Sequence, residues 1–143
     1  MRFALVEPYY GGSHRAWADG YAAASEHDVT LLTLPARFWK WRMHGGAVTL
    51  AKYYLEYGLD PDLILATDML DLTTFLALTR ERTAGKPVAV YFHETQLSYP
   101  WSEGDPDTEL ERDVHYGFIN YTTALAADAV LFNSAFHLRS FLS

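Results

Sequence analysis

Short apolar runs alternate with segments of helical periodicity along the whole of this 143-residue chain. Each apolar run has the length and composition of a buried strand, and a segment with apolar residues three or four positions apart follows it. This alternation is typical of parallel sheets whose strands are connected by crossover helices. We therefore predict an α/β fold, a Rossmann-like parallel sheet of about five strands with helices on both faces. The predicted strands are Phe3–Val6, Asp28–Leu34, Leu63–Ala66, Val88–Phe92 and Ala129–Phe132.

Turn-forming residues set the predicted ends of these elements. Pro8 cannot donate a hydrogen bond to a sheet, so the first strand is predicted to end before it, and Ser13 to cap the following helix. The stretch Ala36–Gly46 is predicted to be irregular, because it lacks a clear period. Two helices are then expected, over Ala47–Tyr57 and Leu70–Arg82.

The C-terminal third is predicted to contain a long loop and two helices. The loop His93–Asp105 ends where Asp105 can cap a helix that begins at Pro106. A last, short helix begins near Ser134; because such a helix is marginal by itself, we expect the chain to be a fragment of a longer protein. The buried face of the helix after the loop is predicted from its apolar period to consist of Leu110, Val114, Phe118, Tyr121 and Leu125.

Composition narrows the classes of function. The chain carries 11 basic and 18 acidic residues, a formal net charge of −7, which argues against broad electrostatic binding of nucleic acid but allows a local basic patch. It has no cysteine, which excludes disulfides and thiolate metal sites. No apolar stretch approaches the roughly 20 residues that span a bilayer, and the start lacks the pattern of a signal peptide. We expect a cytoplasmic protein that binds no membrane.

The segment Glu7–Arg15 follows the first predicted strand, and open α/β sheets bind ligands beyond the carboxyl ends of their strands. Gly11 and Gly12 would let the backbone approach a ligand closely, and N–H groups at the start of the next helix suit a phosphate or a sugar oxygen. Ser13 and His14 add polar side chains there. A plain strand-to-helix turn is an equally weighted alternative. The fingerprint G-x-G-x-x-G is absent, so a dinucleotide site is not expected.

The segment His93–Trp101 follows the fourth predicted strand and is rich in side chains that form hydrogen bonds. The His93 imidazole can change charge near neutral pH or bind a hydroxyl in its neutral form. Glu94 could orient His93 or bind a second hydroxyl. Leu97 rules out the metalloprotease motif H-E-x-x-H. A surface loop with an ordinary histidine is the alternative, which we weigh below a functional loop.

Two further stretches carry candidate residues. Between Pro35 and His44, cations alternate with aromatic side chains, a pattern that can stack bases and contact phosphates. The alternative is that the aromatic residues, Phe38 among them, pack on the sheet while the cations face water. Asn133 and Ser134 follow the last strand, where Ser134 either caps the last helix or joins a polar site at the same sheet edge. The hypothesis for nucleic-acid contact names Arg37, Lys40, Trp41 and Arg42.

Taken together, four motifs resemble the N-terminal domain of the tRNA-queuosine α-mannosyltransferases, also called the glycosyltransferase-like domain-containing protein family. The motifs are Glu7–His14, Leu34–Arg42, Tyr91–Pro100 and Phe132–Ser134. The resemblance implies the N-terminal half of a GT-B fold in a retaining, family-4-like glycosyltransferase. In such enzymes the N-terminal domain chiefly holds the acceptor, so residues 1–143 would form that acceptor-side domain. The nucleotide-sugar domain, C-terminal to it, would be absent from this chain, which we expect to be inactive alone.

The resemblance also implies a reaction and roles for residues. The reaction would transfer mannose from GDP-mannose to queuosine in tRNA, without a metal or other cofactor. His93 would be the catalytic residue near the reaction centre, binding a sugar hydroxyl rather than acting as a strong base. The glycine-rich loop would approach the sugar and its phosphate, and the acceptor would contact Glu94 and Gln96. With the residues singled out above, the predicted substrate-binding set is Gly11, Gly12, Ser13, His14, Glu94, Gln96, Asn133 and Ser134.

Two other functions stay open at this point. One is a glycosyltransferase of the same fold with another sugar donor or another acceptor. The other is a non-enzymatic Rossmann-like binding module, which the length of the complete gene would distinguish from a transferase more than twice as long. The expected partners of the transferase are a nucleotide sugar, queuosine-containing tRNA and the C-terminal domain of the same protein. The sequence does not decide between donor sugars, acceptors or oligomeric states.

Overall fold

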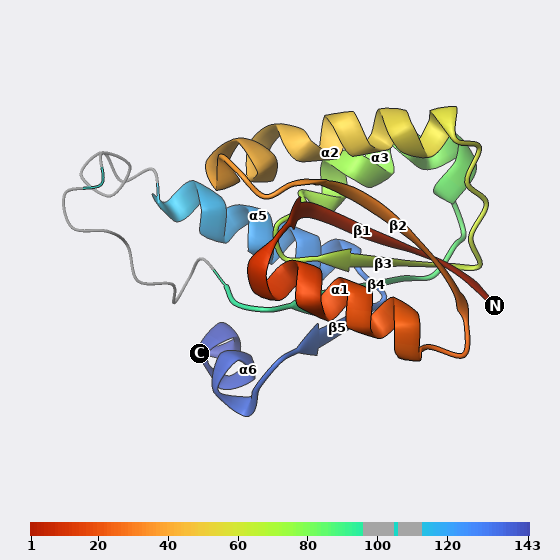
Figure 1. The fold of residues 1–143 in the computed structure, drawn as a ribbon. Coiled ribbons are helices and arrows are strands. Elements are labelled where there is room, and N and C mark those ends of the chain that lie inside the picture. Colours follow the sequence, from red (N-terminus) through yellow and green to blue (C-terminus); the bar gives the residue numbers. More distant parts are fainter. Residues whose placement is uncertain (96–104, 106–112) are drawn as a thin grey trace.

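A computed structural model describes residues 1–95, 105 and 113–143 of the chain (Figure 1). Within these residues, five strands form one parallel sheet in the order β2-β1-β3-β4-β5. The predicted α/β fold with a Rossmann-like parallel sheet is therefore confirmed. The strands are β1 (Arg2–Tyr10), β2 (Asp28–Pro35), β3 (Leu63–Thr67), β4 (Val88–Phe92) and β5 (Ala129–Phe132).

Helices cover both faces of the sheet, as predicted (Figure 1). Helix α1 (Gly12–Ala24) lies on one face, and α2 (Trp39–Glu56), α3 (Leu72–Thr83) and α5 (Asp113–Ala126) lie on the other. Helix α6 (Ala135–Leu142) lies beside the edge strand β5. In the part of the chain that the structure describes, no helix has both the length and the hydrophobicity needed to cross a membrane.

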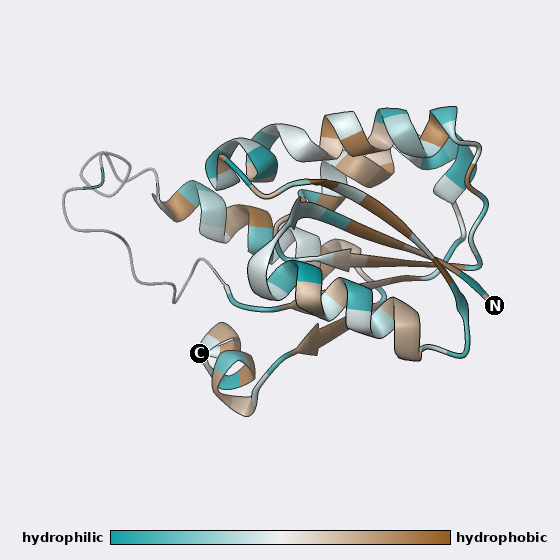
Figure 2. Cartoon of the chain, viewed as in Figure 1, coloured by the Kyte–Doolittle hydropathy of each residue, from teal (hydrophilic) through white to brown (hydrophobic). Residues whose placement is uncertain are grey.

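The core is built from strands whose side chains alternate between the two helical layers. On β1, Ala4 and Val6 pack toward α2 and α3, whereas Leu5 packs with Ala18 of α1. Strand β1 is consequently buried on both faces from Phe3 to Pro8, as expected for a parallel strand between two layers of helices. Figure 2 shows the hydrophobic residues gathered along the strands, with hydrophilic residues on the outer surfaces of the helices.

Two predicted boundaries are wrong. Strand β1 does not end before Pro8 but continues to Tyr10, because its pairing with β2 shifts register between Glu7 and Tyr10 and such an irregularity tolerates a proline. The predicted irregular stretch contains the first two turns of α2, which begins at Trp39. Glycines at 45 and 46 hide its helical period from the sequence, and Gly46 is buried where an added Cβ would lie 3.1 Å from the Cβ of Pro8.

In the turn from β1 to α1, the backbone of Gly11 lies close to Ala36. Ser13 does not cap α1, contrary to the prediction; Gly11 is the N-cap residue, and no side chain caps this helix. A Cβ added at Gly11 would overlap the Cβ of Ala36, which follows β2. The next residue, Gly12, has a φ of +53°, in the left-handed region that favours glycine. This turn therefore requires glycine for two different reasons at consecutive positions.

The predicted buried face of α5 is also wrong. Its side chains Val114, Phe118, Tyr121 and Leu125 are all more than half exposed. The buried face instead carries Tyr116, Ile119, Asn120 and Thr123. Two of these are polar because they bind the β3–α3 loop: Asn120 Nδ2 donates to the Asp68 carbonyl at 3.0 Å, and Thr123 Oγ1 donates to the Leu70 carbonyl at 3.1 Å. The predicted start of this helix at Pro106, and Leu110, lie outside the described residues.

We expect Gly11→Ala to lower the free energy of unfolding by about 1–3 kcal/mol, because the new methyl group forces β1 and β2 apart at their carboxyl ends. The matched control is Gly20→Ala on α1, where nothing lies within 4 Å of the added Cβ and a helical alanine should be favourable. The double variant Gly11→Ala/Ala36→Gly should recover part of the loss. Urea denaturation measures all three. A Gly11→Ala protein as stable as the control would contradict the assigned contact.

Candidate active site

The carboxyl ends of β1, β3 and β4 bring together a cluster of acidic and imidazole side chains. Its members, called the acid–imidazole cluster below, are Glu7, His14, Asp68, His93 and Glu94. Strand β1 lies between β2 and β3, so the strand order reverses at the β1–β3 pair. Open α/β sheets bind their ligands at such a switch point, beyond the carboxyl ends of the strands. The position of this cluster is therefore that of a ligand site.

Glu7 and His14 form a buried pair at the centre of the cluster. Glu7, on β1, is fully buried, and His14, in the first turn of α1, is 6% exposed. His14 Nδ1 donates to Glu7 Oε2 at 3.2 Å, and the backbone N–H of Tyr9 donates to Glu7 Oε1 at 2.9 Å. Both carboxylate oxygens of Glu7 are thus engaged, and the pair connects the end of β1 to the start of α1.

His93 follows β4, and three aromatic rings surround its imidazole. The centroid of the His14 ring lies 4.1 Å from that of His93, with the two planes tilted by 46°. Trp17 and Tyr91 both approach the His93 ring in T-shaped contacts, with centroid distances of 5.1 and 5.0 Å. The structure therefore brings the predicted catalytic residue His93 against the predicted substrate-binding residue His14, although the two lie 79 positions apart in the sequence.

Asp68 lies directly after β3 and is 1% exposed. Its Oδ1 accepts the backbone N–H of His93 at 3.1 Å, so it fixes the start of the β4 exit loop. Its own carbonyl is held by Asn120 of α5. Asp68 therefore connects three elements at the floor of the cluster, and the sequence analysis did not select it.

Burial and neighbouring charges shift the titration of this cluster. Burial raises the pKa of Asp68 to about 8, with the Glu7 charge adding to the rise and the His14 charge opposing it. Burial also lowers the pKa of His93 to about 3, helped by the His14 charge. Burial by itself would lower the pKa of His14, but the hydrogen bond and charge of Glu7, then the charges of Asp68 and Glu94, raise it above its ordinary value. The cluster at neutral pH therefore combines a neutral His93 and a protonated Asp68 with a His14 whose pKa is raised by its pairing with Glu7.

Two overlapping triplets in the cluster have donor atoms within 4.8 Å of one another, close enough for a cation to bridge. They are Glu7–His14–His93 and His14–Asp68–Glu94. In the first triplet, Glu7 and His14 already pair with each other, so no added cation is needed to balance their charges. His93 Nε2 is buried and has no hydrogen-bond partner among the described residues. The predicted metal-free site stays a prediction.

Some of the other predicted substrate-binding residues lie near the cluster. Gly11, Gly12 and Ser13 form the turn into α1, where the N-cap residue, Gly11, offers the first N–H groups of the helix no side-chain acceptor. Glu94 lies in the cluster and is half-buried. Gln96 lies outside the described residues.

Asn133 and Ser134 follow β5, the neighbour of β4, and both are exposed. The backbone N–H of Asn133 donates to the Phe92 carbonyl at 3.2 Å, which ties the two strand exits together. Ser134 caps α6 by accepting the backbone N–H of His137 at 3.2 Å, so the capping interpretation of Ser134 is confirmed. The side chain of Asn133 also contacts the His137 ring. A role for either residue in substrate binding stays a prediction.

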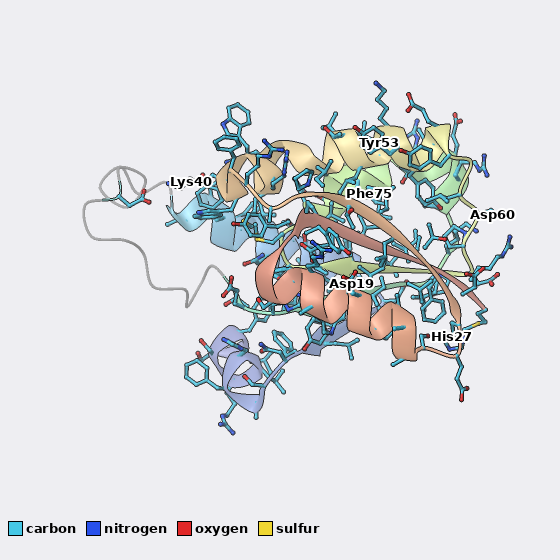
Figure 3. All side chains as sticks on the ribbon, viewed as in Figure 1. Asp19, His27, Lys40, Tyr53, Asp60 and Phe75 are labelled. Carbon is cyan, nitrogen blue, oxygen red and sulfur yellow. The ribbon has the colours of Figure 1, made fainter. Side chains whose placement is uncertain are left out.

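The basic and aromatic stretch surrounds the start of α2, where Figure 3 labels Lys40, at the opposite end of the molecule from Asp60. Phe38 and Trp41 are 71% and 73% exposed, so the alternative in which Phe38 packs on the sheet is wrong. Phe38 is also the N-cap residue of α2, with a φ of 52°. The cations differ: Arg37 is exposed, Lys40 Nζ lies 2.9 Å from Asp105 Oδ1, and Arg42 Nε donates to the Pro35 carbonyl.

Sequence reasoning missed two of the five cluster members as site residues, Glu7 and Asp68. Glu7 was placed in the first loop, but its partner was not foreseen. Asp68 comes directly after the apolar strand predicted at Leu63–Ala66. Applying the rule for strand exits to this third strand, as well as to the first and the fourth, would have found it.

Comparison with known proteins adds a family to this geometry. Residues 2–143 match the family model described as tRNA-queuosine alpha-mannosyltransferase N-terminal. A relative from Drosophila melanogaster, named tRNA-queuosine alpha-mannosyltransferase, is 36% identical over 139 residues. The aligned region covers 96% of this chain and 35% of that relative, so the chain spans about a third of the relative's length. No solved structure matches the chain significantly.

Asp68→Asn should change how stability depends on pH. In the folded chain Asp68 keeps its proton up to about pH 8, whereas an unfolded aspartate loses it near pH 4. Between these values the folded state binds more protons, so the contribution of Asp68 to stability falls as pH rises. We expect Asp68→Asn to gain stability relative to the wild type from pH 5 to pH 8, by up to about 1.4 kcal/mol per pH unit. Urea denaturation across this range measures the difference; parallel curves would disprove the raised pKa.

Proposed function

This chain belongs to the tRNA-queuosine α-mannosyltransferase N-terminal family, and from that premise we propose that it forms the acceptor-side half of a retaining GT-B glycosyltransferase. The observation that carries the proposal is the acid–imidazole cluster at the switch point of the sheet, beside a glycine turn that begins α1. The nucleotide-sugar domain would belong to the part of the protein that this chain does not contain. The chain alone is accordingly proposed to be inactive.

The proposed reaction transfers mannose from GDP-mannose to a hydroxyl of queuosine in tRNA. The bond between the anomeric carbon and the diphosphate oxygen breaks, and GDP leaves with the electron pair. The acceptor oxygen bonds to the same carbon on the same face, and its proton leaves with the diphosphate. No residue of this chain has to become covalently attached to the sugar, and we propose that no metal or other cofactor takes part.

The role proposed for His93 is to bind a sugar hydroxyl. A group with a pKa of about 3 is a weak base at neutral pH, so general-base catalysis by His93 would be inefficient. A neutral imidazole still has one donor and one acceptor nitrogen, and Nε2 has no partner among the described residues. This supports hydrogen bonding to the substrate as the role of the ring.

The start of α1 is proposed to approach the sugar phosphate. Helix α1 begins directly after the carboxyl end of β1, and its N-cap residue, Gly11, has no side chain to cap the first N–H groups. A helix N-terminus in this position attracts anions, because the free N–H groups and the helix dipole both favour negative charge. Gly12 leaves room for a ligand at the turn, because nothing lies within 4 Å of the position that its Cβ would take, and the first side chain after it is that of Ser13.

We expect His93→Ala, in a full-length protein that contains this domain, to reduce mannose transfer by about 100-fold or more while the domain stays folded. Transfer is measured as the mass gain of queuosine-containing tRNA with GDP-mannose as donor. His27→Ala is the matched control, because His27 lies at the opposite edge of the sheet (Figure 3). Unchanged turnover in His93→Ala would remove His93 from the mechanism. Transfer from a different nucleotide sugar in the same assay would favour the alternative donor.

The side chains proposed to contact tRNA are those at the start of α2, above all Arg37 and Trp41, which are both exposed. We expect Arg37→Ala to reduce the slope of log affinity against log salt by about one, since one phosphate contact is lost. Trp41→Ala should weaken binding by about 1–3 kcal/mol without changing that slope, because stacking is lost instead. Arg80→Ala, on the exposed surface of α3, is the charge-matched control. Equal effects of Arg37→Ala and Arg80→Ala would contradict a local tRNA surface.

A further inference from the structure

His93 lies on a loop, but residues of other elements determine the orientation of its ring. Its backbone N–H is bound by Asp68, after β3, and its imidazole packs against His14 and Trp17 of α1. The contact with His14 has the shortest centroid distance of the ring contacts that His93 makes among the described residues, 4.1 Å. The plane of the His14 ring therefore sets the plane in which the His93 ring can lie.

The orientation of His14 is in turn fixed by Glu7. The Tyr9 N–H holds one Glu7 oxygen at 2.9 Å, which leaves the other to accept from His14 Nδ1 at 3.2 Å. This hydrogen bond determines which His14 nitrogen carries its proton and how the ring is turned. A chain of contacts thus leads from the backbone of β1 through Glu7 and His14 to His93.

Stability alone does not explain this pair. Removing a carboxylate and an imidazolium from water costs several kcal/mol, and well-packed apolar residues of similar volume often give an equally stable core. Glu7 is nevertheless fully buried between apolar neighbours on β1. The pair contacts the His93 imidazole, and in the described part of the chain this is the one imidazole with a buried nitrogen, Nε2, that has no hydrogen-bond partner. This arrangement is better explained as a device that orients His93.

We propose that Glu7 and His14 are positioning residues, which hold the His93 imidazole in the orientation in which it binds the substrate. The identity of the substrate in this inference rests on the proposed transferase function. The coupling between Glu7, His14 and the His93 ring does not depend on that function. Neither Glu7 nor His14 has to touch the reacting atoms. Their effect on the reaction is transmitted through His93.

The first test uses Glu7→Gln, which removes the charge but keeps the size of the side chain. In the full-length protein we expect kcat to fall by about tenfold or more, because small errors in the position of a substrate-binding group are costly. KM for tRNA should change less than about twofold, since the acceptor contacts remain. In a His93→Ala background the same substitution should have no further effect on the residual transfer. An equal loss in both backgrounds would overturn the proposal.

The second test uses NMR spectra of this chain and needs no activity. Ring currents from the surrounding aromatic residues determine the imidazole proton shifts of His93, so Glu7→Gln should move them while signals of Phe75, in the core, stay in place. The control is Gly20→Ala on the outer surface of α1, which should leave the His93 signals unchanged. Unchanged His93 signals in Glu7→Gln would also overturn the proposal. If the His93 signals move but the wild-type full-length protein transfers no mannose, the proposed function fails and the positioning of His93 stands.

Discussion

The parallel pairing of β1 with β2 on one side and β3 on the other is the constraint on which the candidate site depends. In this register Val6 pairs with Ala66, and Ala66 pairs with Val90, so Glu7, Asp68 and His93 follow their paired residues at similar levels. Glu7, Asp68 and His93 are therefore brought to one edge of the sheet from distant parts of the chain. A slip of one residue in either pairing would turn these side chains to the other face and separate them.

The acid–imidazole cluster contains more ionisable groups than a buried volume can hold in their charged forms. The fold resolves this by dividing the roles: Glu7 and His14 share a charge-assisted hydrogen bond, Asp68 keeps its proton, and His93 stays neutral. Each group depends on the others, because removing one charge changes the potential at the rest. The cluster consequently acts as a single electrostatic unit with a weakly basic imidazole at its edge.

The sequence predicted the layers of this fold better than its details. Alternating apolar runs predicted all five strands, and the rule for strand exits found His14 and His93, because both are local patterns. The start of α2 was missed because Gly46 interrupts the helical period of the sequence. Gly46 packs tightly against Pro8, where a side chain would not fit without a shift. The inner face of α5 was assigned wrongly because Asn120 and Thr123 are buried to bind backbone groups of the β3–α3 loop. Such long-range hydrogen bonds leave no period in a sequence.

Phe38 combines backbone strain with an exposed aromatic ring. A non-glycine residue in the left-handed region costs roughly 1–2 kcal/mol, and this one also leaves its ring 71% exposed to water. Glycine or asparagine would begin α2 with less strain. Engineering for stability would therefore choose position 38 early. Such a change would also remove an exposed aromatic ring from the surface proposed to contact tRNA.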